Sequence, residues 1–176
     1  ISKNCREWII ADLAIMMAGY VSVPFFPSLK GEELKYLLDF GDVDLLFVGK
    51  IETWDIIGTH IPEDFPIIRF PQYQGCTAVD RGEQWFDFIN QFQPLIKPYV
   101  PKLSDLWTII FTSGTTGNPK GVELSYLALD STKIITEQVN PLKVDFSGNN
   151  DFISYLPLNH IVERVVVEHV CMRFGG

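Results

Sequence analysis

The sequence predicts an α/β protein with a three-layer αβα architecture, in which helices cover both faces of a mostly parallel sheet. The first observation is an alternation of short apolar strands, such as residues 45–48 and 107–112, with longer segments of helical periodicity. Strands that are apolar along their whole length are typical of parallel sheets, because both faces of such a sheet are buried. The second observation is composition: 47% hydrophobic and 20% charged residues among 176 suit a globular protein.

The N-terminal segment predicts a helix followed by a short strand. Asn4 and Glu7 have the spacing of a capping box just before an apolar run, and Gly19 is suited to end the helix. Residues 21–26 then predict a strand that Pro27 stops. We therefore expect Asn4 to cap the first helix.

A second helix, two strands and a third helix follow. The second helix ends at Gly41 and places three leucines on one face, Leu34, Leu37 and Leu38. Apolar strands are predicted at residues 45–48 and 66–70. Asp80 with Glu83 can cap the third helix, whose large apolar residues recur at helical spacing, namely Trp85, Phe88, Ile89 and Phe92. We interpret this stripe as core packing rather than as an aromatic binding face.

A proline-rich linker divides the chain. Residues 94–104 cannot be the interior of a helix, because they contain Pro94, Pro98 and Pro101. We expect this linker to separate a first βα portion, residues 1–93, from a phosphate-loop portion, residues 105–176.

The portion after the linker predicts a strand, a loop, a helix, a second strand and a final helix. Strand 107–112 leads into the loop, and Ser125 is suited to cap the next helix. Residues 140–150 are polar and rich in turn formers, and residues 151–157 predict a strand. For residues 160–172 we favour a helix, because their polar positions do not alternate as they would along a strand.

The strongest chemical signal is the loop between Thr112 and Lys120. Between these two residues stands a run of small hydroxyl residues and glycines: Ser113, Gly114, Thr115, Thr116 and Gly117. Glycines allow several backbone N–H groups to point at one anion, and the hydroxyls add further donors. The loop with its lysine therefore predicts a polyphosphate site, against the alternative of a solvated turn that binds nothing.

The two common phosphate motifs are excluded. The pattern Gly-x-x-x-x-Gly-Lys-Ser/Thr does not fit, because Pro119 stands five residues after Gly114. Moreover, Gly121 rather than a serine or threonine follows Lys120. The dinucleotide pattern Gly-x-Gly-x-x-Gly is also missing from this segment, so the loop is a phosphate loop of a third kind.

A second candidate is His160, which follows the predicted strand 151–157. Loops at the carboxyl ends of parallel strands are where α/β proteins bind ligands, so this position favours a histidine close to the phosphate loop. The alternative is a histidine with a structural role. We expect Glu163 and Arg164 to brace the loop or to cap the following helix.

Both segments resemble the adenylate-forming superfamily, which contains acyl-coenzyme A synthetases, luciferases and the adenylation domains of peptide synthetases. The loop is similar to the phosphate-binding signature of that superfamily. The stretch Tyr155-Leu-Pro-Leu-Asn-His-Ile-Val-Glu-Arg164 is most similar to the long-chain fatty acyl-coenzyme A synthetases. The N-terminal segment matches the same group in Ser2-Lys-Asn, Glu7-Trp8, Asp12-Leu-Ala and Gly19-Tyr-Val-Ser-Val-Pro24.

The resemblance implies part of the large N-terminal domain of an ATP-dependent acid–thiol ligase. In such an enzyme a fatty acid carboxylate attacks the α-phosphorus of ATP, which gives an acyl-adenylate and pyrophosphate, and coenzyme A then displaces AMP. By the same resemblance, residues 113–117 and Lys120 hold the β- and γ-phosphates. Thr112 helps to hold Mg²⁺, and His160 orients the carboxylate or the α-phosphate. His160 and Lys120 are thus the catalytic candidates.

Several elements of that family are not found in the 176 residues. They are a Gly-Tyr-Gly-x-Thr-Glu stretch, a Thr-Gly-Asp stretch for the ribose, and the C-terminal domain with its adenylation lysine. We expect them beyond Gly176 in a longer protein, and we expect the 176 residues alone to be inactive. Two alternatives stay open: an adenylate-forming enzyme for an aryl or amino acid, and a non-catalytic nucleotide-binding module.

The composition of the chain limits which binding partners and which cell compartment we expect. A net charge of −8 argues against nucleic acid as a partner. The three cysteines, Cys5, Cys76 and Cys171, are too few and scattered for a disulfide framework or a zinc site, which favours reduced thiols in a cytoplasmic protein. No secretion signal is evident, and the apolar run 8–18 is too short to span a bilayer. Peripheral membrane contact of a full-length fatty-acid enzyme stays an alternative.

Overall fold

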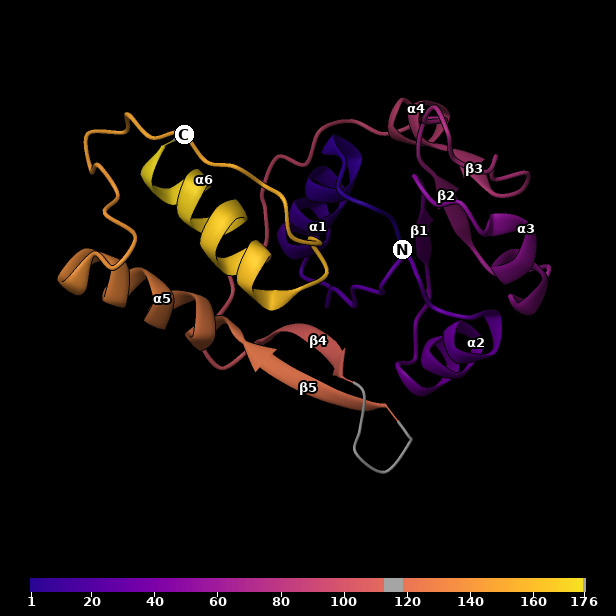
Figure 1. Ribbon diagram of the computed structural model, residues 1–176, viewed down its shortest axis with the longest axis horizontal. Coiled ribbons are helices and arrows are strands. Elements are labelled where there is room, and N and C mark those ends of the chain that lie inside the picture. The colour runs from indigo at the N-terminus through magenta and orange to yellow at the C-terminus, as the bar shows by residue number, and fades with distance from the viewer. Residues whose placement is uncertain (113–118, 176) are drawn as a thin grey trace.

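A computed structural model describes residues 1–112 and 119–175 and has a mixed α/β architecture (Figure 1). A parallel sheet is ordered β1-β2-β3 and consists of β1 (Leu46–Val48), β2 (Ile67–Arg69) and β3 (Glu83–Gln84). An antiparallel pair is formed by β4 (Leu106–Thr112) and β5 (Lys120–Ser125).

Helices surround both sheets. They are α1 (Arg6–Ala18), α2 (Gly31–Phe40), α3 (Trp54–Ile57), the single-turn η1 (Gly58–His60), α4 (Trp85–Ile89), α5 (Tyr126–Val139), the wide-turned η2 (Glu163–His169) and α6 (Val170–Phe174). In Figure 1 the parallel sheet lies with α2, α3 and α4 on one side of α1. Helix α5 and the η2–α6 helix lie on the other side, and the β4–β5 hairpin runs below α1.

Strands β1 and β2 pack against helices on both faces, which confirms the predicted three-layer arrangement, whereas both residues of β3 are exposed. On one face Leu46, Val48 and Ile67 join a core cluster with the three leucines of α2, which are at most 3% exposed: Leu34, Leu37 and Leu38. On the other face Ile68 belongs to a second cluster with residues of α1, Trp8 and Ala11. Alternate residues along β1 and β2 thus face opposite helices, as the period of a strand requires.

Two positions require glycine, one because of its backbone conformation and one because of close packing. Gly19 takes φ of 80° and ends α1, as predicted, because an L side chain rarely adopts this left-handed conformation. Gly49 lies so close to Phe70 that an added Cβ would approach the Phe70 Cβ to 2.4 Å. The turn after β1 therefore packs against the end of β2 without room for a side chain.

Of the three predicted N-caps, Ser125 stands at the N-cap position of α5 without a capping hydrogen bond from its side chain, and the other two are wrong. α1 begins after Cys5, and the Asn4 side chain instead accepts a hydrogen bond from the Leu158 N–H at 2.9 Å and donates one to the Leu156 carbonyl at 2.7 Å. Asp80 accepts a hydrogen bond from the Trp54 indole at 2.7 Å. In both cases a distant segment supplies the hydrogen-bond partner, which local spacing does not reveal.

The strand predictions are partly correct. The strands predicted at 45–48, 66–70 and 107–112 are confirmed, but residues 151–157 contain no strand in the described chain. Of residues 21–26, Ser22 forms a single parallel bridge to Thr108. Strand β5 was not predicted, because its residues are polar or half-exposed and its pairing comes from the hairpin.

Most of the helix predictions are correct. The helix ending at Gly41, the helix after Ser125 and the final helix are confirmed, and residues 93–105 form neither helix nor strand. The aromatic stripe is core at Trp85, which is 5% exposed, but not at Phe92, which is 60% exposed. The reason is that α4 ends at Ile89, so the stripe does not continue on one helix face. Among the described helices, none is long and apolar enough to cross a membrane.

We expect Leu34→Ala to lower the free energy of unfolding by about 2–5 kcal/mol, because it leaves a cavity at a fully buried position. Urea denaturation followed by circular dichroism measures the change. Leu95→Ala is the matched control, since Leu95 is 55% exposed, and it should shift stability by less than about 0.5 kcal/mol. Equal losses in the two variants would contradict the assigned core.

Candidate nucleotide site and its buried support

Thr112 and Lys120 face each other across the β4–β5 hairpin. They are the last paired residues of the ladder before the loop, and the Thr112 hydroxyl lies 3.5 Å from the Lys120 carbonyl oxygen. Both residues are exposed. The five predicted phosphate-binding residues between them, Ser113, Gly114, Thr115, Thr116 and Gly117, lie outside the described residues. The structure therefore fixes the two ends of the loop as an exposed pair of a hydroxyl and a cation.

His160 stands where the final helix begins. Its backbone N–H donates to the Pro157 carbonyl at 2.8 Å, and its Nδ1 accepts a hydrogen bond from the Val162 N–H at 3.3 Å. The side chain is exposed, and it satisfies one of the free N–H groups of the first helical turn. Within the described chain no hydrogen bond joins His160 to Thr112 or Lys120.

Arg164 is the best-connected buried side chain of this region. Its guanidinium donates to both carboxylate oxygens of Asp12, at 2.9 and 2.7 Å, and to the Thr108 hydroxyl at 2.8 Å. Arg164 is fully buried and Asp12 is 3% exposed. The Arg164 guanidinium also lies 4.4 Å from the centre of the Trp107 ring, within the range of a cation–π contact. Arg164 thus links the start of the final helix to α1 and to β4.

Two hydroxyl groups complete this network. The Thr108 hydroxyl donates to the Ser22 carbonyl at 2.6 Å, and the Ser22 hydroxyl donates to Asp12. The hydrogen bonds join α1, the segment around residue 22, β4 and η2. Sequence reasoning missed Asp12 and Thr108. The signal for Asp12 was present, because a carboxylate inside an apolar helical run needs a buried partner.

Glu168 and His169 lie beside this network. A ligand atom of each lies within 4.8 Å of one from Asp12 and of one another. Burial, followed by the charge of Asp12, raises the pKa of Glu168 to about 8. Burial, followed by the charge of Arg164, lowers the pKa of His169 to about 4. Both side chains are therefore neutral near pH 7.

This trio has the residue types of a metal site, but its surroundings do not favour a metal ion. Asp12 already accepts hydrogen bonds from Arg164 and Ser22, so its charge is compensated and its oxygens are engaged. A divalent cation would in addition lie close to the Arg164 guanidinium, which repels it. The arrangement is better described as a compact buried cluster in which Arg164 and Asp12 neutralise each other.

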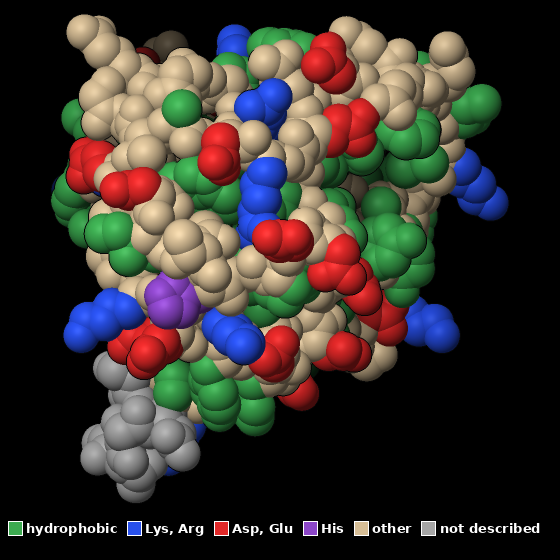
Figure 2. All heavy atoms as spheres, turned by 90° about the vertical axis from the view of Figure 1, so that its right-hand side faces the viewer, with side chains coloured by type: hydrophobic (Ala, Val, Ile, Leu, Met, Phe, Trp, Pro, Cys, Tyr) green, Lys and Arg blue, Asp and Glu red, His purple; other side chains and the backbone are tan. Residues whose placement is uncertain are grey.

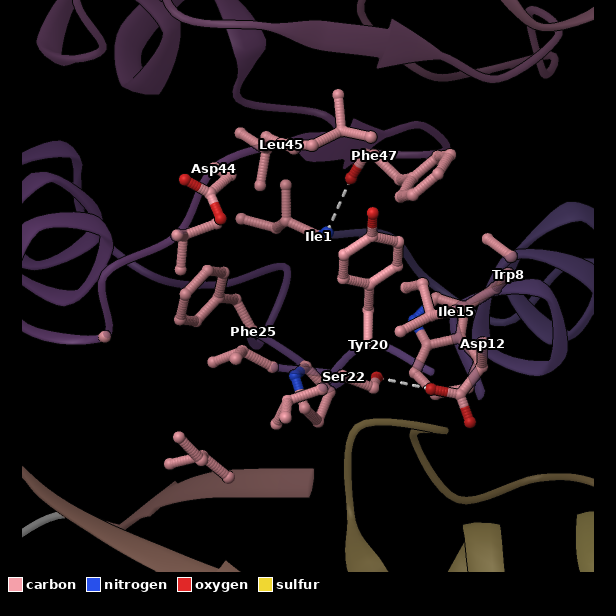
Figure 3. A pocket seen from close by; sticks show the side chains of 18 of the residues that line it. Ile1, Trp8, Asp12, Ile15, Tyr20, Ser22, Phe25, Asp44, Leu45 and Phe47 are labelled. Atoms are coloured by element: carbon pink, nitrogen blue, oxygen red, sulfur yellow. Dashed lines mark hydrogen bonds between the residues drawn. The ribbon is translucent and has the colours of Figure 1, made fainter. Parts of the chain in front are cut away.

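A pocket of about 720 Å³ lies between α1, the segment around residues 20–25 and β1. Figure 3 shows Ile1 and Phe47 at one end of it and the Asp12–Ser22 hydrogen bond at the other. The Ile1 nitrogen donates a hydrogen bond to the Phe47 carbonyl at 2.7 Å. The pocket thus separates β1 from the segment that bridges to β4, and Asp12 joins it to the buried network.

The face over α2, α3 and β3 carries carboxylates and basic side chains interspersed with apolar ones (Figure 2). This mixture differs from the basic stripe that a nucleic-acid surface requires.

Comparison with known proteins defines the class. The AMP-binding enzyme family matches residues 1–176, so the chain belongs to that family. Among curated relatives, it is 30% identical to long-chain-fatty-acid–CoA ligase 1 of Homo sapiens, over 94% of this chain and 25% of the relative. It is also 30% identical to peroxisomal long chain acyl-CoA synthetase 7 of Arabidopsis thaliana, over 92% of this chain and 24% of the relative. The chain thus spans about a quarter of the length of these relatives.

Solved structures show the same fold. An ATP-bound RpMatB-BxBclM chimera superposes with a TM-score of 0.76 at 21% identity, over 99% of this chain and 32% of the other. A putative long-chain-fatty-acid CoA ligase from Rhodopseudomonas palustris superposes with a TM-score of 0.72 at 18% identity, over 99% of this chain and 42% of the other. The expected fold, part of the N-terminal domain of an adenylate-forming enzyme, is confirmed.

We expect the stability difference between the wild type and Glu168→Gln to depend on pH. The folded chain keeps the Glu168 proton up to about pH 8, whereas the unfolded chain releases it near its ordinary pKa of 4.5. Rising pH between these values therefore destabilises the wild type but not the variant, by about 2–3 kcal/mol between pH 6 and pH 8.

Urea denaturation at a series of pH values measures this difference, and groups common to both proteins cancel from it. The matched control is Glu137→Gln, because the Glu137 side chain is 41% exposed. A difference for Glu168→Gln that stays constant across this range would show that the Glu168 carboxyl is ionised in the folded chain.

Proposed function

We propose that the chain provides part of the ATP site of a long-chain fatty acid–CoA ligase. The reaction has two steps. A fatty acid carboxylate attacks the α-phosphorus of ATP and releases pyrophosphate, and the thiol of coenzyme A then attacks the acyl-adenylate and releases AMP. The observation that supports this most is the exposed pair of Thr112 and Lys120, which closes a loop of glycines and hydroxyls in a member of the AMP-binding enzyme family.

The loop suits the triphosphate. We assign the β- and γ-phosphates to Lys120 and to the run Ser113, Gly114, Thr115, Thr116 and Gly117. Because the first step brings two anions together, donors and a cation held in place before the reaction lower its barrier. Lys120 is exposed at the end of a paired strand, so its ammonium group can meet a phosphate from solvent.

Thr112 is the candidate for Mg²⁺. The Thr112 hydroxyl is an exposed oxygen next to the loop, which fits the preference of Mg²⁺ for oxygen ligands. It would supply one ligand, and phosphate oxygens and water would supply the others. The ion would neutralise phosphate charge during the attack.

His160 is proposed to orient the carboxylate or the α-phosphate. Its ring is exposed at the start of a helix, where free N–H groups favour an anion. Together with Lys120 it makes up the proposed catalytic pair.

The assignment of a fatty acid as the substrate rests on the amino-acid sequence of residues 155–164 and on the names of the curated relatives. An adenylate-forming enzyme for an aryl or amino acid is the second candidate, because one structural neighbour is an anthranilate CoA ligase. We also propose a cytoplasmic location and peripheral membrane contact of the full-length protein. We further propose a division of the chain into residues 1–93, 94–104 and 105–176.

In the full-length protein, we expect Lys120→Ala and Thr116→Ala each to slow acyl-adenylate formation. Each change removes a hydrogen bond to a charged phosphate, which corresponds to about a ten- to hundredfold loss of rate. ATP–pyrophosphate exchange with a fatty acid measures the step. Lys97→Ala is the matched control at an exposed lysine outside the proposed site. Unchanged exchange in both test variants would remove the phosphate-loop assignment.

The 176 residues alone are expected to give no exchange at an enzyme-like rate. The stretches that the family uses for adenine and ribose are not present in this sequence, so the α-phosphate would not be held for attack. The measurement is exchange of radiolabelled pyrophosphate into ATP by the isolated chain, with a full-length relative as positive control. Exchange at the rate of that relative would refute this expectation.

A further inference from the structure

We propose that Arg164 is a positioning residue, which sets the place of His160 relative to the strand that enters the phosphate loop. The inference deepens the proposed function and rests on it, because it concerns the same two parts of the site. Arg164 contacts neither substrate nor ATP in this assignment, and it acts through His160 and β4.

Arg164 is close to His160 along the same helix. Arg164 lies one turn after His160, and its backbone N–H donates to the His160 carbonyl at 3.3 Å. Four helical residues correspond to a rise of about 6 Å. Any movement of the Arg164 backbone is therefore passed on to His160.

Arg164 also contacts strand β4. The Arg164 guanidinium donates to the Thr108 hydroxyl at 2.8 Å, and Thr108 stands on the same strand as Thr112. Four strand residues span about 13 Å, so the hydrogen bond holds the helix at a fixed distance from the loop entrance. In this network Arg164 is the side chain that connects the His160 helix to the strand of Thr112.

The Arg164 guanidinium and the Thr108 hydroxyl are both held in place by further contacts. Asp12 holds one side of the guanidinium through two hydrogen bonds, and the Trp107 ring covers it at 4.4 Å. Thr108, which is fully buried, is itself fixed by its hydrogen bond to the Ser22 carbonyl. A planar guanidinium with donors on two edges can serve Asp12 and Thr108 at once, which a lysine ammonium cannot do with the same geometry. The network therefore permits one relative placement of helix and strand.

The decisive experiment compares two buried threonines in the full-length protein. Thr108→Val removes the hydroxyl that accepts from Arg164 and keeps a side chain of similar shape. Thr136→Val is the matched control, because Thr136 is 2% exposed and its hydroxyl donates to the Thr132 carbonyl within the same helix, α5. Thr136→Val loses one hydrogen bond within α5, whereas Thr108→Val loses two, one from Arg164 and one to the Ser22 carbonyl. Only Thr108→Val loosens the link between the two parts of the site.

We expect Thr108→Val to lower kcat for acyl-adenylate formation about ten- to a hundredfold, since misplacement of about 1 Å has an effect of this size. KM for ATP should stay within about twofold, because the phosphate loop itself is unchanged. Thr136→Val should keep kcat within about twofold. Thr108→Ser, which restores the hydroxyl, should recover most of the lost kcat, and Arg164→Lys should behave like Thr108→Val.

A second measurement needs no activity. Spin labels at Val162 and Glu123, two exposed positions on the His160 helix and on β5, report their distance in the 176-residue protein. We expect Thr108→Val to shift or broaden the distance distribution and Thr136→Val to leave it unchanged.

The outcomes separate the two proposals. A full-length wild type that forms no acyl-adenylate overturns the proposed function and this inference with it. An active wild type whose Thr108→Val variant keeps its kcat overturns the positioning role of Arg164 alone, even if the label distance changes. A fall in kcat with an unchanged label distance, or one that Thr108→Ser does not restore, also overturns it.

Discussion

The ion pair between Arg164 and Asp12 is the constraint on which the rest of this structure depends. Its two residues are 152 positions apart, and both are buried. Leaving either charge buried without the other would cost about 3–5 kcal/mol, so the pair forms together or the region does not close. Because Thr108 and Ser22 share the network, closing it also fixes β4 and the bridge that β4 makes to Ser22.

The ion pair explains why the site draws on both ends of the chain. α1 contributes Asp12, and the final helix contributes Arg164 one turn after His160. Asn4 adds two hydrogen bonds from the start of the chain to the segment just before His160. Exposed His160 and exposed Thr112 thus lie on elements that buried polar groups join, which is the kind of rigid support that a functional site needs.

Local sequence patterns predicted the elements whose type is visible in a short stretch of sequence. The leucine stripe of α2, the apolar strands β1 and β2 and the glycine that ends α1 were all read correctly, because periodicity and backbone conformation decide them. The predictions that failed depended on distant partners. The caps at Asn4 and Asp80 were wrong because both side chains bind other segments, and residues 151–157 pair with no strand in the described chain.

The sequence by itself determined the family, and a short run of glycines, hydroxyls and a lysine predicted a phosphate site in the candidate loop. A carboxylate inside the apolar run of α1 also signals that Asp12 needs a buried partner, but this signal was missed. Only the tertiary structure decided that Arg164 is this partner and that the same guanidinium reaches Thr108 on β4. The physical reason is that a buried charge is satisfied by geometry across the whole fold, and no spacing along the chain encodes that geometry.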